Sequence, residues 1–143
     1  DELPDTPGTL VAWPVQAPHA HARLVSLDTT AAARMPGVAS VLTAADIPGA
    51  NQTGPIVPDE PLLPTDTIDY HGQAVAWVLA DTEAQARAAA ALVRATYEPL
   101  PAILDIEAAE AAGSFHLKPS RIERGDPDGA MAAAPFRLDG TLH

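Results

Sequence analysis

The chain has 143 residues, of which 47% are hydrophobic, so it can form one domain with a core and is not expected to be generally disordered. Its 19 acidic and 8 basic residues give a net charge of −11, which excludes the cationic footprint that nucleic acids and anionic membrane surfaces require. The absence of cysteine excludes disulfides, zinc thiolate sites and cysteine-bound iron–sulfur clusters within this chain.

The first eight residues are polar and Pro-rich and predict an extended arm. They lack the basic and apolar segments of a signal peptide, and no apolar run of the chain approaches the ~20 residues of a membrane span. We expect a cytoplasmic protein, which the absence of cysteine fits. The missing initiator methionine leads us to expect a processed or excised piece of a longer chain.

Short apolar runs separated by breakers predict three strands in the first third of the chain. They lie at residues 9–13, 22–27 and 38–42. Pro14 limits the first strand and places its local N–H side at a sheet edge or a bulge. Asp28 can cap a short helix over residues 29–35, and Thr43 can cap a single helical turn.

Residues 48–63 contain four prolines and two glycines and predict one long loop. Loops of this length are usually functional or cover another surface. This loop is therefore our candidate for a contact with neighbouring domains.

Residues 68–101 are the best-defined stretch and predict a strand, a tight turn, a strand, a helix and a strand. Gly72 can supply the positive φ of a sharp reversal. Residues 74–80 are almost wholly apolar, which predicts a strand at the centre of a sheet with both faces covered.

The helix in this stretch has a capping box at Thr82 and Gln85. Its smooth stripe of alanines allows close packing on a sheet. The stripe consists of Ala86, Ala89 and Ala90. Pro99 and Pro101 end the last strand because they lack the N–H that a ladder requires.

Beyond this stretch, residues 106–112 predict a helix that Gly113 ends, and residues 114–124 read as extended. Asp126 as cap and Pro127 as first residue predict a second helix that runs to about residue 133. The alternation in residues 136–143 predicts a strand. Because helices and strands mix without strict alternation, we expect the α+β class with a mixed sheet.

Candidate metal ligands are confined to two histidines. His19 and His21 stand two apart on an extended segment and could ligate one ion from the same face. No third ligand has a comparable spacing, because the other histidines are scattered. We therefore interpret both as loop or packing residues.

Two pairs of carboxylates are candidates for acid–base chemistry, which requires carboxyl groups with different pKa values. They are Asp59-Glu60 and the pair Asp66 and Asp69. Both pairs lie in polar, Pro-rich surroundings, which favours solvated surface charge.

The remaining candidates are a lysine and two tryptophans. Lys118 is the only lysine, but it lacks the tight hairpin of a biotinyl or lipoyl site. Trp13 and Trp77 lie in apolar strands, which favours core or interface packing. With no G-x-S-x-G, G-x-G-x-x-G or P-loop motif, the residues alone predict a structural or docking domain.

Several short motifs follow one another along the whole chain. They are Leu3-Pro4, Gly8-Thr9-Leu10, Ala20-His21-Ala22-Arg23-Leu24, Asp28, Pro36-Gly37-Val38, Val41-Leu42-Thr43-Ala44-Ala45-Asp46-Ile47-Pro48, Tyr70-His71-Gly72-Gln73, Val75, Val78, Ala80-Asp81-Thr82, Ala89-Ala90, Tyr97-Glu98-Pro99-Leu100-Pro101-Ala102, Arg124-Gly125-Asp126 and Gly140. This ordered set resembles the start of the molybdenum-binding subunit of xanthine dehydrogenase-type hydroxylases. The long loop, with Asn51, Gly54-Pro55-Ile56-Val57 and Asp59-Glu60-Pro61-Leu62-Leu63, resembles bacterial xanthine dehydrogenases more than aldehyde oxidases or carbon monoxide dehydrogenases.

The resemblance implies an α/β-hammerhead fold, in which two or three helices pack on a sheet with a β-hammerhead motif. It implies an enzyme that hydroxylates a purine, xanthine to urate, with molybdopterin, iron–sulfur clusters and FAD held by other domains or subunits. Those parts are the implied partners, in an enzyme expected to be a homo-oligomer. We expect residues 1–143 to be one domain, with 114–143 as a tail that leads toward the molybdenum domains.

The family usually has a further strand before Asp1 and continues past His143 through a Gly-Gln-Glu-His-type stretch. Because its molybdenum-binding and substrate-positioning residues lie there, no catalytic, cofactor-binding or metal-binding residue is assigned to this chain, and the fragment is expected to be inactive alone. Two alternatives stay open. They are a free-standing small-molecule or carrier-type binding module and a stand-alone enzyme.

Overall fold

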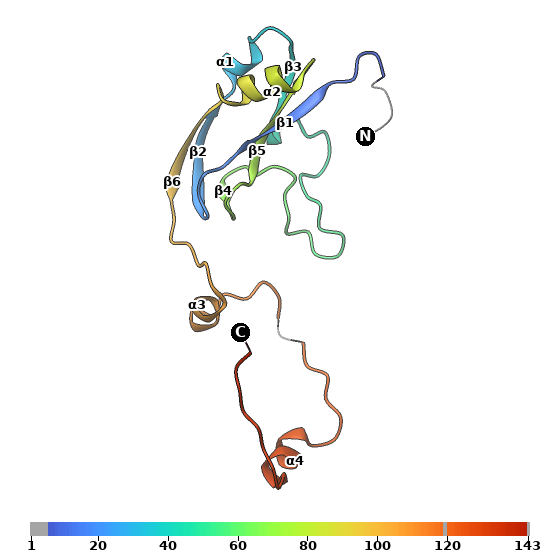
Figure 1. Ribbon diagram of the computed structural model, residues 1–143, viewed down its shortest axis with the longest axis vertical. Coiled ribbons are helices and arrows are strands. Elements are labelled where there is room, and N and C mark those ends of the chain that lie inside the picture. The colour runs from blue at the N-terminus through green and yellow to red at the C-terminus, as the bar shows by residue number, and fades with distance from the viewer. Residues whose placement is uncertain (1–5, 119, 143) are drawn as a thin grey trace. The chain divides into compact units, whose positions relative to one another are not determined.

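A computed structural model describes residues 6–118 and 120–142 (Figure 1). The chain divides into two units, Asp1–Ala102 and Ile103–His143. Among these described residues, all six strands lie in the first unit, together with helices α1 and α2. The second unit contains helices α3 and α4 joined by loops.

The first sheet consists of β1 (Val11–Gln16), β5 (Ala74–Ala80) and β3 (Val38–Leu42), in the order β1-β5-β3. Both pairings are antiparallel. The apolar strand β5 is central, as its sequence predicts. Pro14 lies on an edge strand, also as predicted, but the strand continues past it to Gln16, because an edge strand tolerates a missing N–H on its open side.

The second sheet has the order β4-β2-β6, again with antiparallel pairing. Its strands are β4 (Thr67–Ile68), β2 (Ala22–Asp28) and β6 (Arg94–Pro99).

Gly72 has a φ of 87° in the predicted turn between β4 and β5. The turn therefore passes the chain from one sheet to the other and does not close a hairpin. The expected α+β class, with sheets and few helices, is confirmed.

Helix α2 (Glu83–Ala90) packs on β1 and β5 (Figure 1). Its cap is confirmed, since the Gln85 N–H donates to Thr82 Oγ1 at 3.3 Å and the Thr82 hydroxyl donates to Gln85 Oε1 at 2.8 Å. Ala86 and Ala89 of the predicted stripe are fully buried, and Ala90 is half-buried. This alanine face allows α2 to approach the sheet closely.

Two shorter elements precede the long loop. Helix α1 spans Thr30–Ala33, shorter than predicted, and Asp28 contributes by accepting a hydrogen bond from the Thr30 N–H at 2.9 Å. Thr43 precedes the 3₁₀ turn η1 (Ala44–Asp46). There the Asp46 carboxylate accepts from both the N–H and the hydroxyl of Thr43, at 2.7 and 2.8 Å.

The core of the first unit forms two clusters. One contains Ala32, Val78 and Ala89, between the helices and the first sheet. The other contains Ala17, Ala22, Ile68 and Val75, where the two sheets meet. These side chains are small or β-branched, so tight backbone approach compensates for the scarcity of aromatic residues.

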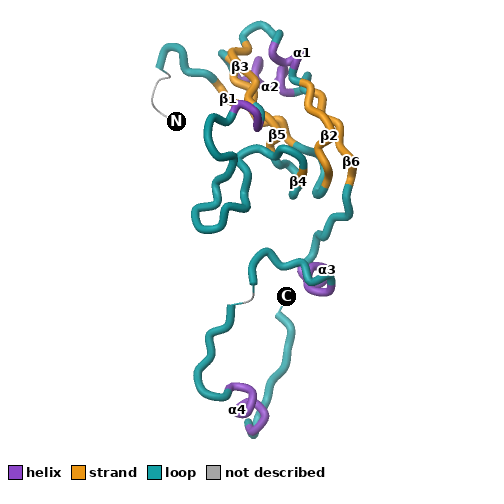
Figure 2. Tube along the Cα trace, turned by 180° about the vertical axis from the view of Figure 1, so that it is seen from behind, coloured by secondary structure: helices purple, strands orange, loops and turns teal. Residues whose placement is uncertain are grey.

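Residues 48–63 form no helix or strand, as predicted, and extend from the first unit as a long loop (Figure 2). The Asn51 side chain closes its base, because Nδ2 donates to the Leu63 carbonyl at 2.7 Å and Oδ1 accepts from the Leu63 N–H at 3.1 Å. Further from the base of the loop, the Thr53 N–H donates to the Glu60 carbonyl at 2.7 Å. The loop therefore has a defined conformation.

In the second unit, α3 spans Ile106–Ala111 and α4 spans Pro127–Ala133, close to the predicted bounds. Asp105 and Asp126 cap them by accepting from the N–H groups of Ala108 and Gly129. None of the described residues from 103 to 142 is buried. The strand predicted over 136–143 is wrong for its described residues, which pair with no other strand; residue 143 lies outside the described residues.

Candidate functional site

The structure gives both candidate histidines structural contacts. His21 Nδ1 donates to the Pro101 carbonyl at 2.6 Å and so links β2 to the segment after β6. His19 packs edge-on against Tyr97, with ring centroids 5.2 Å apart. Among the described residues, no group of three or more His, Asp or Glu side chains could hold a metal ion.

The candidate carboxylates are exposed and lie apart in the fold. Asp59 and Glu60 belong to the long loop, whereas Asp66 and Asp69 flank β4 in the second sheet. Lys118 is exposed in an irregular segment of the second unit. The structure assigns none of these five side chains to a common site.

The two tryptophans lie on opposite faces of the first sheet. Trp13 on β1 faces α2, where the Arg87 guanidinium lies 5.3 Å from the centre of its ring. Val78 contacts the α2 side through Ala89, so its neighbour Trp77 points away from α2 by strand alternation. Trp13 is a packing residue, as predicted, and Trp77 belongs to the open face.

The open face of the first sheet has an apolar row across all three strands. Trp77 at the centre pairs with Pro14 on β1 and with Leu42 on β3. Residues opposite each other in adjacent strands share a face, so these three side chains are neighbours. Trp77 is 37% exposed and Leu42 is 38% exposed.

An apolar groove of about 310 Å³ lies beside this row. Its lining comes from β3, β5, η1 and the two ends of the long loop. The lining residues are Leu42, Thr43, Asp46, Ile47, Pro48, Leu62, Leu63 and Trp77. We call this groove and the row of Pro14, Trp77 and Leu42 the Trp77 face.

The charge around the Trp77 face is negative. Asp46 is the charged residue in the groove lining. The hydrogen bond from the Thr43 backbone N–H, and to a smaller extent that from the Thr43 hydroxyl, hold the pKa of the Asp46 carboxyl below its usual value. Asp59 and Glu60 are exposed in the long loop, and no Lys or Arg lines the groove. The charged side chains of the groove lining and of the loop are therefore acidic.

A second cavity of about 410 Å³ lies between β2, η1 and residues 64–65. Its lining consists of aliphatic side chains and hydroxyl groups, without a charged side chain. The lining residues are Leu24, Val25, Ser26, Leu27, Thr43, Ala44, Ala45, Pro64, Thr65 and Val75. This lining contains no Asp, Glu, His, Lys or Arg side chain.

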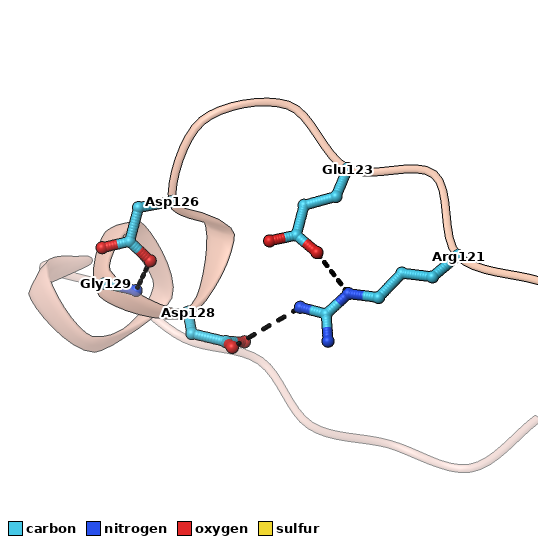
Figure 3. A network of polar contacts seen from close by, with 5 residues as sticks. All are labelled: Arg121, Glu123, Asp126, Asp128 and Gly129. Atoms are coloured by element: carbon cyan, nitrogen blue, oxygen red, sulfur yellow. Dashed lines mark hydrogen bonds and ion pairs between the residues drawn. The ribbon is translucent and has the colours of Figure 1, made fainter.

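The second unit contains a local polar network (Figure 3). Arg121 forms ion pairs with Glu123 and with Asp128, the latter at 3.6 Å, beside the Asp126 cap of α4. All these side chains belong to the stretch 121–129. The network thus orders the start of α4 and is not a reactive centre.

Taken together, the described residues form an apolar surface on the first unit and place no nucleophile beside a base. The sequence predicted the apolar strand β5 and the long loop, but not that the loop ends and Trp77 share one groove. The sequence feature that points to this surface is the apolar side chain at every position of residues 74–80. A strand with only one covered face would alternate apolar and polar side chains, so this run indicates that the second face is also meant to be covered. The surface is suited to binding a polypeptide.

Comparison with known proteins agrees with this fold. The family model "Aldehyde oxidase and xanthine dehydrogenase, a/b hammerhead domain" matches residues 4–101, nearly the whole first unit. Among the described residues, no helix is long and apolar enough to span a membrane.

Two curated relatives and one solved structure are similar to this chain. Xanthine dehydrogenase of Oryza sativa subsp. japonica is 46% identical over 121 residues, which is 85% of this chain and 9% of that protein. Aldehyde oxidase 2 of Cavia porcellus is 38% identical over 144 residues, 100% of this chain and 10% of that protein. The aldehyde oxidoreductase of Desulfovibrio gigas superposes with a TM-score of 0.68 and 39% identity, covering 73% of this chain and 13% of that chain.

The chain thus spans about a tenth of the length of the curated relatives it matches. The family match covers 98 consecutive residues, 4–101, which include both core clusters and the Trp77 face. The chain therefore belongs to the a/b hammerhead domain family of aldehyde oxidases and xanthine dehydrogenases.

Proposed function

We propose that the chain is the structural and docking domain at the start of the molybdenum-binding subunit of a xanthine dehydrogenase, of the bacterial type that its long loop resembles. The full enzyme converts xanthine to urate in the cytoplasm, and this domain positions other parts of it. The observation that carries the proposal is the 46% identity to a xanthine dehydrogenase over 121 residues.

The residues of this chain do not fit an iron–sulfur cluster. Such a cluster requires thiolate or histidine ligands in fixed positions, and the chain has no cysteine and no cluster of histidines among its described residues. We assign the iron–sulfur clusters to other domains or subunits, and we propose that molybdopterin and FAD are held there as well. The residues of this chain take no catalytic role.

The domain contributes rigidity and surface. The two core clusters fix both sheets, and the Asn51–Leu63 hydrogen bonds fix the base of the long loop at 2.7 and 3.1 Å. The partners of this scaffold are the remaining molybdenum domains and the FAD and iron–sulfur parts of a homo-oligomeric enzyme. Residues 1–143 act as one functional domain whose residues 114–143 lead toward the molybdenum domains.

The second unit supports this role because none of its described residues is buried. Ten large apolar side chains among its described residues are exposed. They are Ile103, Leu104, Ile106, Phe115, Leu117, Ile122, Met131, Phe136, Leu138 and Leu142. Burial of each is worth about 1.5–3 kcal/mol, so contact with further protein surface would stabilise this unit strongly.

A test of the proposal uses the full-length enzyme. The purified protein should contain molybdenum and oxidise xanthine faster than aldehydes or carbon monoxide, whereas residues 1–143 alone should show no turnover. Deletion of residues 49–62 in the full-length enzyme should impair assembly or turnover. Unchanged assembly and turnover would refute the docking role of the loop, and turnover by the fragment would refute the absence of catalytic residues.

Aldehyde oxidation is the second candidate activity. The aldehyde oxidase of Cavia porcellus covers the whole of this chain at 38% identity, and the Desulfovibrio gigas enzyme shares its fold. The higher identity to a xanthine dehydrogenase favours xanthine. A ratio of kcat/KM values for xanthine and for an aromatic aldehyde below one would reverse this preference.

A further inference from the structure

The Trp77 face has the features of a binding site for a polypeptide segment. Tryptophan supplies a large contact area, and tryptophans in well-packed pockets dominate binding energies at protein interfaces. Here Trp77 lies in the middle of a sheet face, between Pro14 and Leu42, and contributes to the wall of an apolar groove. An apolar side chain of a partner can enter this groove and cover the indole.

The groove is formed before any partner binds. Its loop wall contains Leu62 and Leu63, and the Leu63 backbone is held by two hydrogen bonds from Asn51. Its opposite wall is the central strand of a sheet. Because both walls are fixed by the fold, binding requires little ordering of the domain.

The charge pattern identifies the chemistry of the partner. Asp46 lies in the groove lining, and Asp59 and Glu60 are exposed in the loop, three and two residues before Leu62. No Lys or Arg lines the groove. A segment with Lys or Arg beside its apolar side chain complements this surface, whereas an acidic segment is repelled.

The same pattern argues against a second copy of this chain. Two copies joined through this face would place acidic loop against acidic loop, which is unfavourable. The curated relatives carry about nine tenths of their length outside the region that matches this chain. That remainder is the largest source of a partner segment.

We propose that the Trp77 face docks one segment of the same polypeptide outside residues 1–143, in which an apolar side chain fills the groove and a flanking Lys or Arg meets the acidic loop. This inference rests on the proposed function, because it requires the chain to be part of a longer enzyme. It goes further by naming the face, the anchoring residue and the charge of the partner.

Photo-crosslinking in the full-length enzyme tests the proposal. Trp77→p-benzoylphenylalanine places an aromatic crosslinker in the groove, and Leu62→p-benzoylphenylalanine places it on the loop wall in a variant that leaves the sheet intact. Both probes should capture the same peptide of the same polypeptide, with Lys or Arg within about three residues of the captured position. Leu92→p-benzoylphenylalanine, at a similarly exposed leucine after α2, is the control and should not capture that peptide.

Capture of another subunit, of a second copy, of a segment without a nearby cation, or of nothing by both probes would overturn the proposal. A second set of variants tests the charge of the partner without identifying the captured peptide. Asp59→Lys with Glu60→Lys should lower the capture yield of the Leu62 probe about fivefold, the effect expected from loss of two exposed charge pairs. The matched change of Asp66→Lys with Asp69→Lys should not, and equal yields in both variants would exclude a cationic partner.

Molybdenum content and xanthine turnover, measured on the same crosslinking preparations, separate the two proposals. An active molybdenum enzyme whose probes capture no such segment refutes the docking site alone. A protein without molybdenum whose probes capture the basic segment refutes the proposed function alone.

Discussion

Val78→Ala is expected to destabilise the first unit by about 2–3 kcal/mol. The side chain of Val78 is fully buried against Ala32 and Ala89. The substitution removes two methyl groups, worth about 0.8 kcal/mol each in transfer free energy. It also leaves a cavity, which costs roughly 24 cal/mol per Å³, or about 1 kcal/mol for a volume of some 45 Å³.

This cavity is expected to persist because its surroundings cannot fill it. The buried neighbours are alanines, and among the half-buried side chains around the cluster only Met35 is flexible. The other side chains there are alanine or valines, whose χ1 is restricted by branching at Cβ. The cost should therefore lie toward the upper part of the range for such truncations.

Urea unfolding of the 143-residue chain, followed by tryptophan fluorescence, measures this cost. The only two tryptophans are Trp13 and Trp77 in the first sheet, so the signal reports on the first unit. The unfolding midpoint should fall by roughly 1–2 M. Val25→Ala on β2 is the control with the same loss of strand propensity, because Val25 is 57% exposed, and it should cost less than about 0.5 kcal/mol. Equal shifts for both variants would refute the assignment of the core.

The remaining predictions use the same unfolding assay, except the last. Gly37→Ala should destabilise the first unit by about 1–2 kcal/mol, because Gly37 has a φ of 83° and an added Cβ would lie 2.2 Å from Gln85 Nε2. Gly49→Ala, where an added Cβ would meet open space, is the control and should be nearly neutral. A larger loss at Gly49 than at Gly37 would contradict the turn geometry. Thr82→Ala should cost about 1 kcal/mol through loss of the α2 cap and Thr82→Ser should restore most of it, so an equal loss in both variants would show that the hydroxyl is not the cap. Hydrogen bonds from Thr43 lower the pKa of the Asp46 carboxyl in the folded state, so this group contributes stability above its unfolded pKa of about 3.9. That stability is lost as the pH falls through the lower folded pKa. Asp46→Asn should therefore weaken the dependence of unfolding free energy on pH in this window, and an unchanged dependence would contradict the assignment. A peptide of residues 103–143 should lack stable helix in circular dichroism, because none of its described residues is buried, and strong helicity would show that the unit folds without a partner.

Local signals in the sequence located most elements of the first unit. Breakers and caps placed the third strand at Val38–Leu42 and the central strand at Ala74–Ala80, in agreement with the structure. The Thr82 cap fixed the start of α2, and Asp126 with Pro127 fixed the start of α4. These features depend on residues that are close in the chain, so a single sequence reveals them.

Features that depend on distant partners were less accessible. The continuation of β1 beyond Pro14 depends on its position at a sheet edge, which no local pattern specifies. The turn at Gly72 was predicted, but the separation of β4 and β5 into two sheets depends on β2, about 50 residues earlier in the chain. Residues 136–142 alternate like a strand but find no pairing partner among the described residues. Alternation records a tendency to pair, and pairing itself needs a second strand.

The candidate site follows from a disagreement between pattern and fold. Every side chain from Ala74 to Ala80 is apolar, which predicts a strand covered on both faces. The structure covers one face with α2 and covers the other at Val75, where the second sheet packs, but leaves Trp77 37% exposed. An apolar side chain at the centre of a strand contributes its full stabilisation only when it is covered, and the first unit itself leaves Trp77 partly exposed. The strand that defines the core of the first unit therefore also marks the place where we propose that a further segment packs.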